Sequence, residues 1–157
     1  MSTRLHLLAA CLLCSLAPAA MADGDVGRPG VPLLPAYRTE CSACHVAYPP
    51  GLLPAASWQG VMQNLPQHYG TDASLEPAQV AELSAWLQAH AGTARRMGTA
   101  APPEDRITRS ALFIRTHDEV PAAAWQRPAI KSRANCGACH PKADQGDFNE
   151  HQVRIPR

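Results

Sequence analysis

The sequence lacks a marked excess of either charge: its 157 residues include 14 basic and 13 acidic side chains, for a formal net charge of +1. Domains that bind nucleic acid carry a clear basic excess, so the composition argues against nucleic acid and against a strongly charged membrane surface as partners. After residue 22 the chain also lacks any apolar run approaching the roughly 20 residues that cross a bilayer. We therefore expect no membrane-spanning segment in the rest of the chain.

The first 22 residues have the pattern of a secretory signal peptide. Arg4 supplies the positive flank, residues 7–16 form an apolar run, and Ala20-Met21-Ala22 resembles a cleavage site. An uncleaved anchor is the alternative, but the run is too short to span a bilayer. We therefore expect cleavage after Ala22 and a periplasmic mature chain of residues 23–157.

Cysteine is also scarce once this leader is removed. Of the six cysteines, Cys11 and Cys14 leave with residues 1–22, and the other four lie in the segments Cys41-Ser42-Ala43-Cys44-His45 and Cys136-Gly137-Ala138-Cys139-His140. No cysteine remains for a structural disulfide, although an exported protein could form one.

Both segments read C-x-x-C-H, the attachment signature of c-type haem. Two thiols three positions apart can each add to one vinyl group of a haem, and the adjacent histidine then lies under the iron as its proximal ligand. A redox dithiol and a structural zinc site also use paired C-x-x-C. The two pairs are separated by 91 residues and each is followed by histidine, which disfavours both alternatives. The sequence therefore predicts two covalently bound haem c groups, attached at Cys41, Cys44, Cys136 and Cys139.

The sixth ligand of each iron must come from elsewhere in the chain. His45 and His140 are the proximal ligands, and His6 leaves with the leader. Histidine and methionine are the usual distal ligands. The candidates in the mature chain are His68, His90, His117, His151, Met62 and Met97.

A helix leading to His68 is predicted by apolar residues at helical spacing. Trp58, Val61, Met62 and Leu65 form one face, with Ser57 as the expected N-cap and Pro66 as the break. We interpret Met62 as core on this face. His68 then follows the end of a rigid element, where it is well placed to ligate iron.

A second helix is predicted over residues 75–91, with Ser74 as N-cap and Gly92 as its stop. His90 falls in its last turn, where an imidazole often only complements the helix dipole. Residues 92–106 lack apolar periodicity and are rich in Gly, Thr, Ala and Pro, as in a linker. A linker position makes Met97 the weaker ligand candidate.

A third helix is predicted from Thr108, as N-cap, to about His117, ahead of Pro121. His117 precedes His140 by 23 residues, the same separation by which His68 follows His45. The two connecting segments therefore have the same length, which suggests that both irons are ligated by histidine in the same way. His151 lies near a polar terminus and is expected to be exposed.

At these residues the chain resembles a known family, the small periplasmic dihaem cytochromes c that work with the oxygen-binding monohaem "sphaeroides haem protein" of purple bacteria. The resemblance covers nearly the whole mature chain and includes both distal histidine candidates. The matching positions are residues 41–50, 53–54, 57–58, 65, 68–70, 73–75, 107–108, 113, 117 and 135–140.

The resemblance implies a mainly α fold with two small haem domains, the first similar to a class I cytochrome c. It also implies histidine on both sides of each iron, with His45 and His68 on the first and His117 and His140 on the second. We expect the domains to comprise residues 23–97, and residues 98–157 including the linker. The implied partner is another periplasmic haem protein, an oxygen-binding monohaem cytochrome, and a membrane b-type cytochrome is the candidate donor.

Irons that carry two protein ligands are closed to substrates, so an electron carrier is favoured over an enzyme. A small haem enzyme or a gas sensor would need one open iron, and a sensor would need an output module as well. Six basic residues are expected around the second haem, where they could form a docking face, or merely solvate the surface or pair with the haem propionates. They are Arg106, Arg109, Arg115, Arg127, Lys131 and Arg133.

Overall fold

The computed structural model describes residues 31–98 and 100–157. The predicted signal peptide, residues 1–22, lies outside the described residues. Within them the chain is helical and forms no β-strand, only an isolated bridge between His68 and Thr71, and no helix is long and apolar enough to cross a membrane. The expected mainly α fold is confirmed. The α-helices are α1 (Pro35–Cys41), α2 (Ala55–Gln63), α3 (Pro77–Ala89), α4 (Ala94–Met97) and α5 (Ala111–Thr116).

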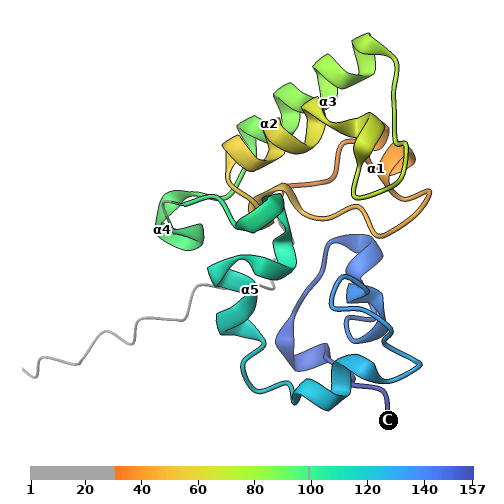
Figure 1. Ribbon diagram of the computed structural model, residues 1–157, viewed down its shortest axis with the longest axis vertical. Helices are drawn as coiled ribbons and strands as arrows, with labels where there is room; N and C mark the ends of the chain where they lie inside the picture. Colours follow the sequence, from red (N-terminus) through yellow and green to blue (C-terminus); the bar gives the residue numbers. More distant parts are fainter. Residues whose placement is uncertain (1–30, 99) are drawn as a thin grey trace, which may run out of the picture.

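The first part of the chain is built on α1, α2 and α3, which lie together at one end of the molecule (Figure 1). Their apolar faces meet in one core, in which Leu83 and Leu87 of α3 are completely buried. Trp58 of α2 lies in the same core and donates its indole N–H to the Pro50 carbonyl at 2.7 Å. Each large apolar side chain buried in this way stabilises the fold by about 1.5–3 kcal/mol. The other core residues are Tyr37, Ala47, Leu53, Met62 and Leu65.

All three predicted N-caps are wrong, two of them in this part of the chain. Ser57 is buried within α2, which begins at Ala55. The cap of α3 is Glu76, which forms a reciprocal capping box with Gln79. Ser74 instead donates its backbone N–H to the Asp72 carboxylate at 2.9 Å, because a short polar side chain competes locally for nearby backbone groups.

Residues 92–106 contain more structure than the predicted linker. They include the short helix α4, and Met97 at its end is only 4% exposed. Gly92 allows this packing, since a Cβ there would lie 2.5 Å from Met97 Cγ and 2.7 Å from the Gly51 carbonyl. The division into two domains between residues 97 and 98 stays a prediction.

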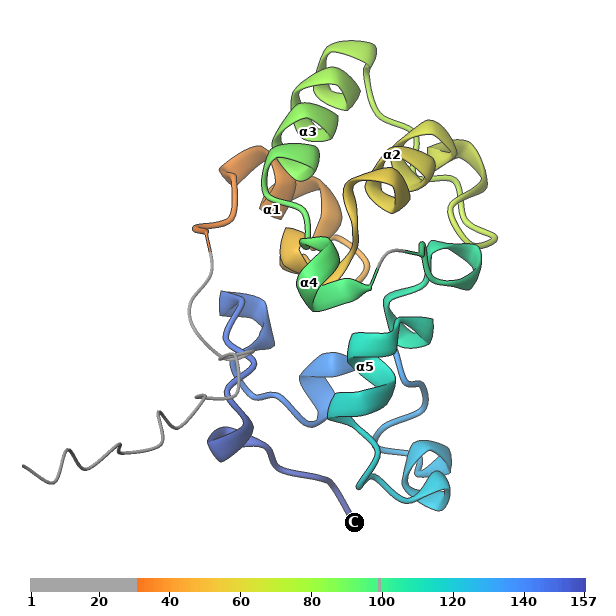
Figure 2. The ribbon, with the colours of Figure 1, turned by 90° about the vertical axis from the view of Figure 1, so that its left-hand side faces the viewer.

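The last third of the chain is made mostly of 3₁₀ turns around α5, at the opposite end of the molecule from α3 (Figures 1 and 2). The N-cap of α5 is Ser110, whose hydroxyl accepts from the Phe113 N–H at 3.0 Å. The predicted cap, Thr108, lies in a preceding 3₁₀ turn. The buried apolar residues of this part are Leu112, Phe113, Ala124, Ile130 and Ala143.

Candidate functional site

The first C-x-x-C-H segment begins at the end of α1, where Cys41 is the last helical residue. His45 then faces His68, with ring centroids 6.2 Å apart and planes inclined by 23°. His68 follows the 3₁₀ turn Leu65–Gln67, and its backbone is fixed by hydrogen bonds to Leu65 and Thr71. The chain therefore brings the predicted proximal and distal histidines of this site together.

The second site has the same plan but different elements. His140 follows the 3₁₀ turn Cys136–Ala138, and His117 caps the C-terminus of α5. Their ring centroids are 6.1 Å apart with the planes inclined by 72°. In both sites, the histidine of the C-x-x-C-H segment therefore faces the predicted distal histidine.

The spacing of both pairs fits an iron atom between the rings. Metal–imidazole bonds are about 2 Å long, which places the centroids of two ligating rings about 6 Å apart. His45 donates its Nδ1–H to the Val46 carbonyl at 2.7 Å, and His117 donates to the Phe113 carbonyl at 2.9 Å. A donating Nδ1–H leaves the Nε2 lone pair free for a metal.

The protonation of these rings also suits ligation. Burial lowers the pKa of His68, and the neighbouring His45 lowers it further. Burial likewise lowers the pKa values of His117 and His140. Each shift favours the neutral imidazole, which is the form that binds a metal.

The thiols are poorly suited to the alternative chemistries. Burial raises the pKa of Cys41 and of Cys136 to about 11 in each case. A redox dithiol needs a thiolate, which a lowered pKa supplies. No disulfide joins the four cysteines of the described chain, and no cluster of three metal-ligating side chains occurs in residues 31–98 and 100–157.

The remaining ligand candidates lie elsewhere, because the rings that face His45 and His140 are those of His68 and His117. Met62 and Met97 are buried in the apolar core, as was predicted for Met62 alone. His90 donates Nδ1–H to the Trp86 carbonyl at 2.8 Å and lies against the Trp86 ring. The His151 side chain is 84% exposed, as expected.

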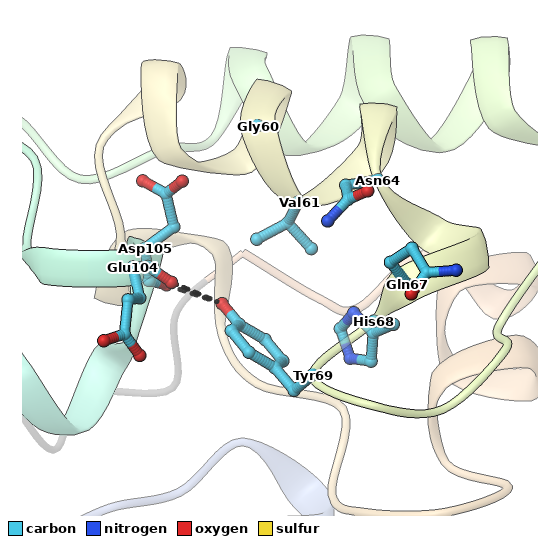
Figure 3. A pocket seen from close by; sticks show the side chains of 8 residues that line it. All are labelled: Gly60, Val61, Asn64, Gln67, His68, Tyr69, Glu104 and Asp105. Carbon is cyan, nitrogen blue, oxygen red and sulfur yellow. Dashed lines mark hydrogen bonds between the residues drawn. The ribbon is translucent and has the colours of Figure 1, made fainter.

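A hollow opens beside His68 and is lined partly by the segment that follows α4 (Figure 3). Tyr69 lies between His68 and this segment. Its hydroxyl is 3.0 Å from the Glu104 carbonyl and 3.1 Å from the Asp105 carbonyl. The backbones of Tyr69, Glu104 and Asp105 all have positive φ, a conformation that costs free energy in non-glycine residues and is kept only where surrounding contacts enforce it. Arg106 adds such a contact by covering the Tyr69 ring at 4.3 Å.

The profile of the dihaem cytochrome c family matches residues 37–148, a range that contains both C-x-x-C-H segments and both histidine pairs. The chain belongs to the dihaem cytochrome c family. It carries two covalently bound haem c groups, and the Cys41/Cys44 and Cys136/Cys139 pairs have the spacing that attaches them. The chemistry of this dihaem cytochrome c is therefore electron transfer.

Solved structures agree with this assignment. A dihaem cytochrome c from Shewanella baltica is 38% identical, with 78% of this chain and 92% of that chain covered and a TM-score of 0.68. Two structures of the dihaem cytochrome c of Rhodobacter sphaeroides are 41% and 42% identical, with TM-scores of 0.62 and 0.65. In both cases the match covers 73% of this chain and 96% of the other. No curated protein matches the chain.

Aromatic residues lie against the histidines of this dihaem cytochrome c, and the motifs alone do not indicate them. Tyr48 stacks on His45 with centroids 4.7 Å apart, and Phe113 stacks on His117 with centroids 4.0 Å apart. Trp125 lies 6.0 Å from His117, also between centroids. Phe113 could have been found from its i, i+4 spacing to His117 on a helix. Nothing in the local pattern indicates the role of Trp125.

Proposed function

We propose that this dihaem cytochrome c is a periplasmic electron carrier in which each iron has two histidine ligands. His45 and His68 hold the first iron, and His117 and His140 hold the second. The observation that carries the proposal is the spacing of the two pairs, 6.2 and 6.1 Å between ring centroids. Haem supplies the one-electron chemistry, and the chain's own residues set which positions on the iron are accessible.

This ligand set favours a carrier over an enzyme. An iron with protein ligands on both faces has no position for a substrate or a gas, so a change of oxidation state is the chemistry that remains. Histidine in place of methionine also gives a lower potential, because the thioether ligand raises it. A small haem enzyme or a gas sensor would need one iron with an open position.

The proposed electron acceptor is another periplasmic haem protein, an oxygen-binding monohaem cytochrome, and the proposed donor is a membrane b-type cytochrome. The basic residues near the second site support a docking face smaller than the sequence suggested. Arg106 and Arg109 pair with Glu104, at 2.9 and 2.6 Å, and Arg127 donates to the Pro156 carbonyl. Arg115 and Lys131 remain as exposed basic groups for an acidic partner, and Arg133, which is also exposed, lies over the Trp125 ring at 5.2 Å.

Intact mass and carbon monoxide addition test the proposal together. The purified protein should have the mass of residues 23–157 plus two haems, and the reduced form should not bind carbon monoxide. A retained leader would contradict export with cleavage. Immediate carbon monoxide binding by one haem would contradict the two-histidine ligand set and favour the enzyme or sensor alternative.

A further inference from the structure

Side chains that flank the first C-x-x-C-H segment reach backbone carbonyls that flank the second. Arg38, three residues before Cys41, donates to the Asp144 carbonyl at 2.7 Å. Tyr48, three residues after His45, donates its hydroxyl to the Ala134 carbonyl at 2.9 Å. These hydrogen bonds join residues 106 and 86 positions apart in the chain, and they hold the two attachment segments against each other.

Tyr48 is held at both of its ends. Its ring lies parallel to the His45 imidazole, with the planes inclined by only 16° and the centroids 4.7 Å apart. Its backbone carbonyl accepts the hydroxyl of Tyr37 at 2.8 Å, and Tyr37 is itself only 2% exposed. The position of the Tyr48 ring is therefore fixed by the core of the first site.

The carbonyl that accepts the Tyr48 hydroxyl is also hydrogen-bonded to the second attachment segment. Ala134 O also accepts the backbone N–H of Cys136 at 3.0 Å. Cys136 is the first thiol of the second attachment segment. A continuous series of contacts thus runs from the His45 ring, through the Tyr48 ring and hydroxyl, to the Ala134 carbonyl and the Cys136 amide.

We propose that Tyr48 is a positioning residue that couples the two haem sites of this chain and supports electron exchange between them. The inference rests on the proposed function, since it takes His45 as a ligand of the first iron. One electron passes between the sites, so that one iron is oxidised and the other is reduced by a single electron. No bond is broken and no proton moves, because Tyr48 acts as a hydrogen-bond donor and keeps its proton.

Tyr69 provides a matched comparison. It lies against the other histidine of the first pair, with a centroid distance of 4.9 Å to His68, and its hydroxyl also reaches carbonyls of the later chain. Those carbonyls belong to Glu104 and Asp105 and not to an attachment segment. Tyr48→Phe and Tyr69→Phe therefore each delete one hydroxyl beside one histidine, and only the first deletion interrupts the series that leads to Cys136.

The test is two-dimensional exchange NMR of the half-reduced protein, which follows haem methyl signals as the electron moves between the two sites. Dilution separates this intramolecular exchange from exchange between molecules. We expect Tyr48→Phe to lower the intramolecular rate several-fold and Tyr69→Phe to leave it close to that of the wild-type protein. A redox titration of each variant reports whether the separation of the two potentials changes in parallel.

Two outcomes would overturn the role of Tyr48. The first is an unchanged exchange rate in Tyr48→Phe. The second is an equal fall in both variants, which would show that the hydroxyls only fasten the two parts of the chain together. In either case, low-spin spectra and resistance to carbon monoxide in the wild-type protein would leave the proposed carrier function standing.

Discussion

Phe113 contacts His117 twice from the preceding turn of α5. Their rings are nearly parallel, at 17°, with centroids 4.0 Å apart, and the Phe113 carbonyl accepts the His117 Nδ1–H at 2.9 Å. The first contact fixes the plane of the imidazole, and the second fixes which nitrogen carries the proton. The helix therefore presents Nε2 of His117 to the second site.

Replacing Phe113 with alanine should destabilise the protein and loosen His117. Phe113 is 7% exposed, and truncation of a buried phenylalanine typically costs about 3–5 kcal/mol. Denaturant unfolding measures the loss, and carbon monoxide addition reports whether the second iron becomes accessible. Ile114→Ala is the control, because Ile114 is 57% exposed on the same helix and its truncation should change neither property appreciably.

Removing either distal histidine should open one haem only. In His68→Ala the first iron, and in His117→Ala the second, should become high-spin and bind carbon monoxide, while the other haem stays low-spin. The control is His90→Ala, since the His90 ring lies against Trp86, whereas the rings that face His45 and His140 are those of His68 and His117. An unchanged spectrum in His68→Ala would contradict the ligand assignment and would return His90 and Met62 as candidates.

Met97 should contribute to stability and not to the haem spectrum. Because Met97 is 4% exposed, Met97→Ala should lower the free energy of unfolding by about 2–5 kcal/mol with both haems still low-spin. Met97→Leu conserves most of the volume and should cost less than about 1.5 kcal/mol. A new high-spin signal in both variants would instead identify Met97 as a ligand.

Glu104 should stabilise the fold at neutral pH and lose this effect in acid. The hydrogen bond from Arg106, followed by the charge of Arg109, holds the pKa of Glu104 below its usual 4.5. A lowered carboxyl pKa stabilises the folded state above the unfolded value of about 4.5, and the contribution disappears as the pH falls through the folded value. Glu104→Gln should therefore have a slightly lower Tm than wild type at pH 7, and the difference should vanish in acid.

The ion pairs of Glu104 with Arg106 and Arg109 are exposed, so salt should also reduce the stabilisation that they provide. The Debye length is about 3 Å at 1 M ionic strength. Thermal melts of both proteins at pH 7, with and without 1 M salt, measure this. A Tm difference that persists in acid and in high salt would show that Glu104 acts through packing or backbone conformation instead of charge.

The exposed basic groups near the second site should steer an acidic partner. Charge complementarity acts mainly on association rates, so Arg115→Gln, Lys131→Gln and Arg133→Gln should each slow oxidation by an acidic acceptor haem protein at low salt. Stopped-flow rates at rising ionic strength measure the effect. Arg109→Gln is the control because Arg109 already pairs with Glu104. Rates that do not respond to salt would contradict this docking face.

Short-range chemistry made much of this protein predictable from its sequence. The haem attachment segments are each five consecutive residues, so their chemistry needs no tertiary information. Helix type followed from apolar spacing, and the end of α5 at His117 was predicted correctly. The helix starts were not, because Ser57 and Ser74 are good caps by residue type whereas Pro77 and the Glu76–Gln79 box fixed where α3 begins.

The sequence by itself determined two attachment motifs, a helical fold and a short set of candidate ligands. Only the tertiary structure decided which candidates face the motif histidines. The two histidines of each pair are 23 positions apart in the chain, and the turns between them set the distance between their rings. It also decided that Met97 is buried and that Tyr48 reaches Ala134, 86 residues away. Such contacts depend on how separate elements pack, and the periodicity of a single element carries no information about the surface that it meets.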